Sequence, residues 1–163
     1  MVVIIKQKKI SIMKNILKLM LALSVVFGSL SCGGGEDTPQ VGTKIVAEWH
    51  LVSMSGVTSV PQVYVNFAQD LTFELYQKVG EGRYRKYDGT YTVTGNVVSG
   101  KYSDNKSWGS DYDASFEGET LVLTAKNGSA EVCKYEKKAL SETDKANAIL
   151  VTKSVEEDGP RFF

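Results

Sequence analysis

Few side chains of this sequence could carry acid–base, nucleophilic or metal chemistry. The 163 residues include one histidine, His50, and two cysteines, Cys32 and Cys133, which stand far apart in the sequence. A catalytic triad or a zinc site needs several such groups side by side, and this set cannot supply them. We therefore expect His50 to be a surface residue and Cys133 to be a small, partly buried one.

Four carboxylates lie close together in the sequence, at Asp111, Asp113, Glu117 and Glu119. Paired carboxylates can do acid–base work or hold a calcium ion. In this stretch they alternate with large apolar side chains, so in a strand they would point away from the interior. We interpret them as a solvated face, and we predict no catalytic residue, no metal site and no cofactor. The sequence thus predicts a protein that is not an enzyme.

Cys32 is the residue for which the sequence predicts covalent chemistry. It follows an apolar run at 19–30, and lysines precede that run. A membrane-spanning helix needs roughly 20 apolar residues, so this shorter run has the length of a signal-peptide core. A complete signal of this kind begins at Met13, which we take as the true start of translation.

The segment resembles a bacterial lipoprotein signal, in which a lipid is attached to the cysteine and the peptide is cut just before it. Ser29 and Ser31 suit that cut, although the usual pattern has leucine three places before the cysteine, where this chain has Ser29. The same small residues would suit ordinary signal peptidase, which would leave the Cys32 thiol free. The resemblance implies a signal peptide over residues 1–31 and an acylated Cys32 as the first mature residue.

The charge balance argues against a nucleic-acid partner. Five of the 19 basic residues lie in the first 31 positions, whereas all 19 acidic residues lie beyond them. The mature part is therefore acidic overall, and it would repel a polyanion rather than gather it. We predict no nucleic-acid binding.

Residues 32–43 are rich in glycine and contain proline and threonine, which predicts a flexible tether. Glu36 and Asp37, soon after the cysteine, resemble the export tag of surface-exposed lipoproteins in Bacteroidetes. The predicted location is the bacterial cell envelope, as an outer-membrane lipoprotein held by its lipid anchor. Exposure at the cell surface and a periplasmic orientation both remain open.

From Lys44 onward, short β-rich runs alternate with turn signals, which is typical of an all-β sandwich or barrel. Hairpin signals at 80–82, 95–96, 117–119 and 127–128 join successive runs. Eight antiparallel strands can remove both exposed edges by closing into an up-and-down barrel, which we predict over 44–138, with a sandwich as the alternative. The runs are 44–53, 62–68, 71–79, 83–94, 97–103, 108–116, 120–125 and 130–138.

Alternation along these runs assigns one face of each strand to the interior. Leu71 falls on that face, as do Gly89 and Gly100, which would allow sharp bending or simply weaken their strands. The interior is rich in aromatic side chains, and these are the predicted ligand-contacting residues. They are Trp49, Phe67, Phe73, Tyr87, Tyr91, Tyr102, Trp108, Tyr112 and Phe116.

Residues 139–163 are predicted to form a short helix and a tail packed on the barrel. Ser141 and Asp144 have the spacing of a capping box, and Ala146, Ile149 and Leu150 follow at helical spacing. The tail ends in two phenylalanines, whose exposure to water would be unfavourable. We therefore expect the tail to fold back.

The first run, AEWHLVS, resembles the lipocalin Gly-x-Trp signature, with Ala47 at the glycine position and Trp49 as the tryptophan. With NFAQDLTFELYQK, DGTYTVTGNVVSG and the lipoprotein start, residues 44–138 are similar to the lipocalin-like lipoproteins of Bacteroidetes. The resemblance implies an eight-stranded calycin-type barrel with Trp49 near its closed end. Lipocalins stack an arginine over this tryptophan, but the eighth run offers only lysines, so we predict Arg161 as its cation–π partner.

Two functions are consistent with such a barrel. The first is non-catalytic binding of one small apolar or amphipathic ligand in the interior, which eight strands leave just wide enough. The second is a structural or interaction module whose interior is filled by its own side chains. That second function would use an exposed patch near Tyr64, Tyr76 and Tyr84 to contact an envelope protein partner.

Overall fold

The computed structural model describes residues 41–78, 80–151 and 161–163. The predicted signal peptide, the predicted acylation site Cys32 and the tether up to residue 40 lie outside the described residues. In chain order the elements are α2 (Val41–Lys44), β1 (Ala47–Met54), β2 (Gln62–Phe67), β3 (Thr72–Lys78), β4 (Tyr84–Thr94), β5 (Val97–Tyr102), β6 (Tyr112–Glu117), β7 (Thr120–Ala125), β8 (Val132–Lys137), α3 (Glu142–Asn147) and β9 (Ile149–Leu150). Among these elements no helix is both long and apolar enough to cross a membrane.

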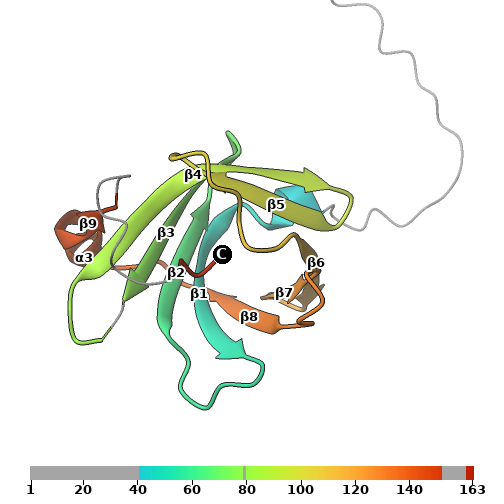
Figure 1. The fold of residues 1–163 in the computed structure, drawn as a ribbon, viewed down its shortest axis with the longest axis horizontal. Coiled ribbons are helices and arrows are strands. Elements are labelled where there is room, and N and C mark those ends of the chain that lie inside the picture. The colour runs from blue at the N-terminus through green and yellow to red at the C-terminus, as the bar shows by residue number, and fades with distance from the viewer. Residues whose placement is uncertain (1–40, 79, 152–160) are drawn as a thin grey trace, which may run out of the picture. The chain divides into compact units, whose positions relative to one another are not determined.

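Eight antiparallel strands close into a barrel (Figure 1). The order around the sheet is β3-β2-β1-β8-β7-β6-β5-β4, and an additional pairing of β3 with β4 joins its two ends. Every strand of the ring is therefore paired on both sides, so the ring has no free edge that could pair with another chain. The closure confirms the predicted up-and-down barrel and excludes the sandwich.

The strand boundaries agree with the predicted runs at most positions, because β-branched and aromatic residues alternate along them. Two boundaries differ by more than two residues. The first strand begins at Ala47, because residues 41–44 form the short helix α2, whose Val41 packs against the core. The sixth strand begins at Tyr112, because the residues around Trp108 belong to the β5–β6 connection.

Among neighbouring strands of the ring, β5 and β6 share the fewest ladder pairs. Only two residue pairs join these strands, Val97 with Asp113 and Val98 with Tyr112. On the other side of β5, the long strand β4 pairs with β5 along its second half, and the short β9 pairs in parallel with β4 at Arg85 and Lys86. The region next to β5 is therefore covered by the β5–β6 connection and by C-terminal residues rather than by a continuous ladder.

The β2–β3 turn departs from the predicted alternation. Leu71, which was predicted to point inward, is 49% exposed and has a left-handed backbone with φ of 66°. The Asp70 carboxylate closes this turn by accepting hydrogen bonds from the Thr72 amide (3.1 Å) and from the Thr72 hydroxyl (2.6 Å). Strand β3 thus begins one residue later than predicted, and Leu71 faces water.

Helix α3 begins as predicted and ends earlier. The Ser141 hydroxyl accepts a hydrogen bond from the Asp144 amide at 3.1 Å, which caps the helix. Ile149 and Leu150 were predicted to continue the helical face, but they form β9 instead and are exposed. The main-chain pairing with β4 explains the difference, because it requires an extended backbone at these two residues.

Residues flanking α3 cover the surface that was predicted as an exposed patch. Leu140 and Ala148 pack against Tyr64 and Tyr76, which are both buried, and against the half-buried Tyr84. The prediction of an exposed tyrosine patch is therefore wrong. These rings form a second, smaller apolar cluster between the outer face of the barrel and the helical segment.

Candidate functional site

The antiparallel topology gives the barrel two different ends. The hairpin turns after β2, β4 and β6 lie at one end, together with α2, which we name the turn end. The connections after β1, β3, β5 and β7 lie at the other, which we name the loop end. Tyr102 ends β5 and Tyr112 begins β6, so both lie toward the loop end.

Trp49 lies toward the turn end, where α2 also lies. Its side chain is fully buried, its indole N–H donates to the Ile45 carbonyl at 2.7 Å, and its ring lies 6.0 Å from that of Phe116. The cation over the Trp49 ring is Lys137, whose Nζ lies 5.6 Å from the ring centroid. Lys137 sits directly opposite Trp49 in the β1–β8 ladder. The prediction of Arg161 at this position is therefore wrong, because the eighth strand supplies the cation.

The C-terminal residues enter the barrel. Figure 1 shows the chain end marked C within the ring of strands. The Phe163 side chain is only 5% exposed, and its ring stacks on Trp108 at a centroid distance of 4.3 Å and an angle of 23°. Its edge faces Tyr112 at 5.5 Å, and the Tyr102 hydroxyl donates to the Phe163 backbone oxygen at 2.9 Å. The tail folds back as predicted, but into the interior.

Trp108 reaches the interior from the β5–β6 connection because Gly100 leaves room for its ring. A Cβ atom at Gly100 would lie 2.0 Å from Cε2 of Trp108, which no real contact permits. The indole also meets Phe73 at 5.1 Å and Phe67 at 6.3 Å in edge-on contacts, the geometry that aromatic quadrupoles favour. Gly100 is thus needed here for close packing of a ring on the backbone.

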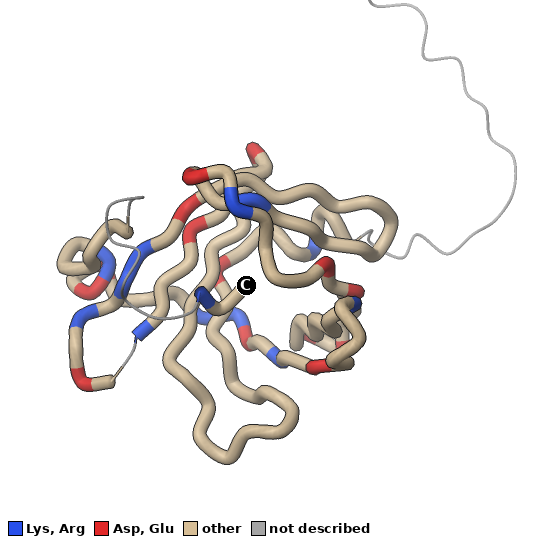
Figure 2. Tube along the Cα trace, viewed as in Figure 1, with Lys and Arg blue, Asp and Glu red and all other residues tan. Residues whose placement is uncertain are grey.

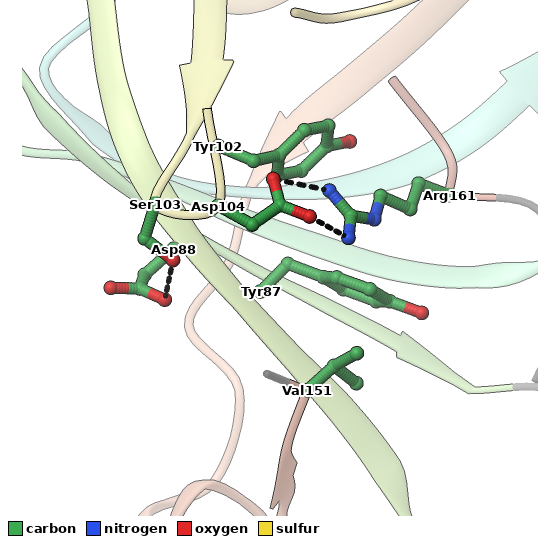
Figure 3. A pocket seen from close by; sticks show the side chains of 7 residues that line it. All are labelled: Tyr87, Asp88, Tyr102, Ser103, Asp104, Val151 and Arg161. Carbon is green, nitrogen blue, oxygen red and sulfur yellow. Dashed lines mark hydrogen bonds and ion pairs between the residues drawn. The ribbon is translucent and has the colours of Figure 1, made fainter. Parts of the chain in front are cut away.

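Arg161 holds the tail at the mouth of the barrel. Its guanidinium donates to both carboxylate oxygens of Asp104, at 3.0 and 2.5 Å. The guanidinium carbon lies 4.5 Å from the ring centroid of Tyr102 and 5.5 Å from that of Tyr87. Figure 3 shows the ion pair between these two rings. The hydrogen bonds from Arg161 hold the pKa of Asp104 well below its usual value, although its side chain is only 7% exposed.

A small pocket of about 10 Å³, enough for about one water molecule, opens beside this ion pair. Two carboxylates line it, Asp88 and Asp104, and the Ser103 hydroxyl donates to Asp88 at 3.1 Å. The remaining lining residues are Tyr87, Tyr102, Val151 and Arg161. The barrel wall therefore contributes negative charge and aromatic faces, and the tail contributes the guanidinium.

The indole nitrogen Nε1 of Trp108 is buried in the interior without a hydrogen bond to any described residue. The hydroxyl of Tyr135 is also buried there, with Cys133 as its neighbour. Burial raises the pKa of Tyr135 well above its usual value, and the Cys133 thiol, a weak hydrogen-bonding group, lies beside it. A buried polar group without a partner costs about 1–3 kcal/mol. The Trp108 N–H is therefore available to donate a hydrogen bond in the interior.

The predicted ligand-contacting residues divide into two groups. Seven of them form one network of ring contacts with Phe163, which extends from the loop end to the rings beside the β2–β3 turn: Phe67, Phe73, Tyr87, Tyr91, Tyr102, Trp108 and Tyr112. Trp49 and Phe116 contact each other toward the turn end, where the half-buried Phe116 also lies under Lys44, with Nζ 4.9 Å from its ring centroid. A candidate site at the loop end therefore does not include these two.

Sequence reasoning missed Asp104 and the position of Phe163. Neither belongs to a strand, so alternation could not assign either of them to a face. The paired phenylalanines were a signal that the tail folds back, but they did not say where it docks. Tyr135 was also missed because the inward face of the eighth run was not assigned, and its side chain is fully buried.

The four carboxylates face solvent as predicted, and three of them pair with lysines of neighbouring segments. The oxygen-to-nitrogen distances are 3.1 Å for Asp113–Lys126, 2.7 Å for Glu117–Lys134 and 3.2 Å for Glu119–Lys137. Figure 2 shows acidic and basic residues interspersed along the barrel. Within the part of the chain that the structure describes, no three side chains of the metal-ligating types gather.

His50 and Cys133 occupy apolar surroundings rather than reactive ones. The His50 ring stacks on Tyr64 at 4.3 Å on the outer face, and burial, with Lys138 nearby, lowers its pKa. Cys133 is 1% exposed, so it is more deeply buried than the partly buried residue that was predicted. Burial, with Glu131 nearby, raises the pKa of its thiol to about 12, which keeps it protonated and unreactive at neutral pH.

Comparison of the chain with curated proteins finds no match. Residues 45–142 match the lipocalin-like domain family. The matched range runs from the residue after α2 to the first residue of α3, so it covers all eight strands of the closed barrel, whereas Arg161 and Phe163 lie beyond it. The matched range and the antiparallel closure agree, and the chain belongs to the lipocalin-like domain family.

Proposed function

We propose that this protein is a non-catalytic, lipid-anchored protein of the bacterial cell envelope that binds one small apolar or amphipathic molecule inside its barrel. The observation that carries the proposal is the position of Phe163. Its ring fills the interior between Trp108 and Tyr112, yet it comes from the tail rather than from a strand. A ligand ring of similar size would meet the same faces.

The packing around Phe163 supports this proposal. An eight-stranded barrel leaves room for its own side chains or for one small ligand. Here the strands and the β5–β6 connection supply every ring of the network except the one at Phe163. The buried N–H of Trp108, which makes no hydrogen bond to a described residue, would gain one from a ligand acceptor. Removing the tail would therefore leave a space between Trp108 and Tyr112 that matches a ring in size, together with an indole N–H that is free to donate a hydrogen bond.

The alternative function is a structural module whose barrel is filled permanently. The close fit of Trp108 on Gly100 favours it, because this packing already leaves little free volume between β5 and the interior. In that case Phe163 is simply a part of the core, and no molecule replaces it. Any partner would then contact the outer face away from the tyrosines that α3 covers.

The test uses the full chain purified from its native envelope, as wild type and as Phe163→Ala. Native mass spectrometry of both proteins should reveal a bound small molecule, at higher occupancy in the variant. Phe162→Ala is the matched control, since Phe162 lies in the same tail but is only partly buried. A mass without any bound molecule in wild type and in Phe163→Ala would overturn the binding proposal and leave the filled barrel.

The membrane anchor is a separate part of the proposal and rests on the sequence around Cys32. Burial of acyl chains contributes about 0.8 kcal/mol per CH₂, so two or three chains would hold the protein firmly in a bilayer. Mass analysis of the amino-terminal peptide should show an acylated Cys32 at the mature end. An unmodified thiol at that position would overturn the anchor. Protease treatment of whole cells would separate a surface-exposed protein from one that faces the periplasm.

A further inference from the structure

We infer that the loop-end site takes an amphipathic organic cation, with its positive group against Asp104 between Tyr87 and Tyr102 and its aromatic ring on Trp108. The inference rests on the proposed function and names the class of ligand. The C-terminal residues Arg161 and Phe163 fill this site in the structure. The tail is held there by a guanidinium at one point and by a phenyl ring at another.

The cation position is defined by one carboxylate and two ring faces. Asp104 is a half-buried residue whose carboxylate accepts both guanidinium hydrogen bonds, while Tyr102 and Tyr87 lie within cation–π range of Arg161. The Lys106 amide also donates to Asp104 at 3.1 Å, which fixes the carboxylate in place. Asp88 adds a second carboxylate to the same pocket. This combination of acids and aromatic faces suits a cation and disfavours an anion.

The ring position is defined by Trp108 and Tyr112. Phe163 stacks on Trp108 face to face and meets Tyr112 edge-on. Tyr102 links the two positions, because its ring faces the guanidinium while its hydroxyl donates to the Phe163 backbone oxygen. A ligand that spans both positions therefore needs a cation and an aromatic ring, and a polar acceptor between them would gain the Tyr102 hydrogen bond.

The Asp104 carboxylate distinguishes between ligand classes. A molecule that displaces Phe163 together with Arg161 removes the ion-pair partner of Asp104 and both of its charge-assisted hydrogen bonds. A neutral ligand does not offset this cost, and a fatty acid or another carboxylate increases it through repulsion. Only a cation restores the pair. The tethered tail also competes with any ligand, since linkage gives it a high effective concentration.

The test compares three matched molecules on the full chain: 4-phenylbutylamine, 4-phenylbutan-1-ol and 4-phenylbutanoate. The protein variants are Arg161→Ala/Phe163→Ala, which vacates the site, and the same double variant with Asp104→Asn. Both carry Trp49→Phe, so that Trp108 is the reporting tryptophan. We expect the amine to bind the double variant at least tenfold more tightly than the alcohol, and the carboxylate to bind most weakly. Asp104→Asn should abolish this preference without weakening the alcohol.

The outcomes separate the inference from the proposed function. If the alcohol or the carboxylate binds as well as the amine, the inference is overturned and the binding function stands. If none of the three binds a double variant that melts cooperatively, both are overturned. The affinity of the tripeptide Arg-Phe-Phe for the double variant, compared with that of the amine, shows whether the cation is better supplied by a peptide or by a small amine.

A measurement on the intact tail covers the case in which the double variant does not fold. Wild type carrying 4-fluorophenylalanine at position 163 reports displacement of the ring through its fluorine resonance. The amine should shift this resonance at concentrations at least tenfold lower than the alcohol does. Equal effects of amine and alcohol would contradict the inference. Phe162 labelled in the same way is the control, because its ring does not occupy the position between Trp108 and Tyr112.

Discussion

Arg161 and Asp104 form a two-pronged ion pair across 57 positions of the sequence, at 3.0 and 2.5 Å. The pair joins the tail to the residues that follow β5, beside the part of the wall where only two residue pairs connect β5 with β6. Because Phe163 follows two positions later, the ion pair also places its ring over Trp108. One charged contact thus couples the mouth of the barrel to its aromatic interior.

Replacing Arg161 by alanine should destabilise the protein by about 2 kcal/mol, because hydrogen bonds to charged groups are worth about 1.5–3 kcal/mol. Urea unfolding measures the change. Arg161→Lys should recover only a part of it, since an ammonium cannot form the two parallel bonds. Glu119→Gln is the surface control and should change the unfolding free energy by less than about 0.5 kcal/mol, because exposed pairs contribute little. An equal loss in both variants would contradict a special role for the Arg161 pair.

The ion pair should also affect how the free energy of unfolding decreases at acid pH. Arg161 lowers the pKa of Asp104 from its usual 3.8, so the native state holds this proton less tightly than the unfolded state does. The stabilisation from Asp104 is therefore fully present above about pH 4 and is lost as the pH falls toward the lower folded pKa. Unfolding free energies of wild type and Asp104→Asn should differ by a constant amount from pH 5 to 8 and converge below pH 4. A gap that persists undiminished at pH 2 would contradict the assignment.

Gly100→Ala should disrupt the interior, since the added methyl group would overlap the Trp108 ring at 2.0 Å. Overpacking typically costs about 1–3 kcal/mol. We expect a loss in this range, together with a red shift of Trp108 emission as the ring moves toward water. Gly42→Ala is the matched control, because its nearest neighbour, Cγ1 of Val93, is 3.9 Å away. Unchanged emission in Gly100→Ala would show that the ring does not rest on this residue.

Cys133 should resist alkylation in the folded protein, because its thiol is buried and its pKa is raised to about 12. Iodoacetamide at pH 8 should modify it only after denaturation, as peptide mass mapping would show. In a protein processed at Cys32 without acylation, the native thiol count would then report Cys32 alone. Rapid native modification of Cys133 would show that this part of the barrel opens readily.

Most of the barrel could be predicted because the inner face of each strand follows from residues that are close together in the sequence. Alternation from Val63 to Phe67 or from Leu121 to Leu123 assigns an inner face using neighbours in the sequence alone. Departures arise where a local interaction competes with this alternation. The Asp70 side chain closes the β2–β3 turn and sends Leu71 outward, and pairing with β4 draws Ile149 into an extended backbone.

The candidate site could be predicted only in part. Its wall residues on strands, such as Tyr91 and Tyr102, follow from the same alternation. The cation that contacts the Trp49 ring does not follow from alternation, since the choice between Lys137 and Arg161 depends on which cation lies across the ladder. The covering of Tyr64 by Leu140 likewise depends on where α3 docks, which no local pattern records.

The sequence by itself determined an antiparallel barrel of eight strands with an aromatic interior, because period-two alternation and hairpin turns act between close neighbours in the chain. Only the tertiary structure decided what fills the loop end. The contacts of Arg161 with Asp104 and of Phe163 with Trp108 join segments more than fifty positions apart. Charge and shape complementarity select such contacts in three dimensions, and the spacing of residues along the chain carries no record of them.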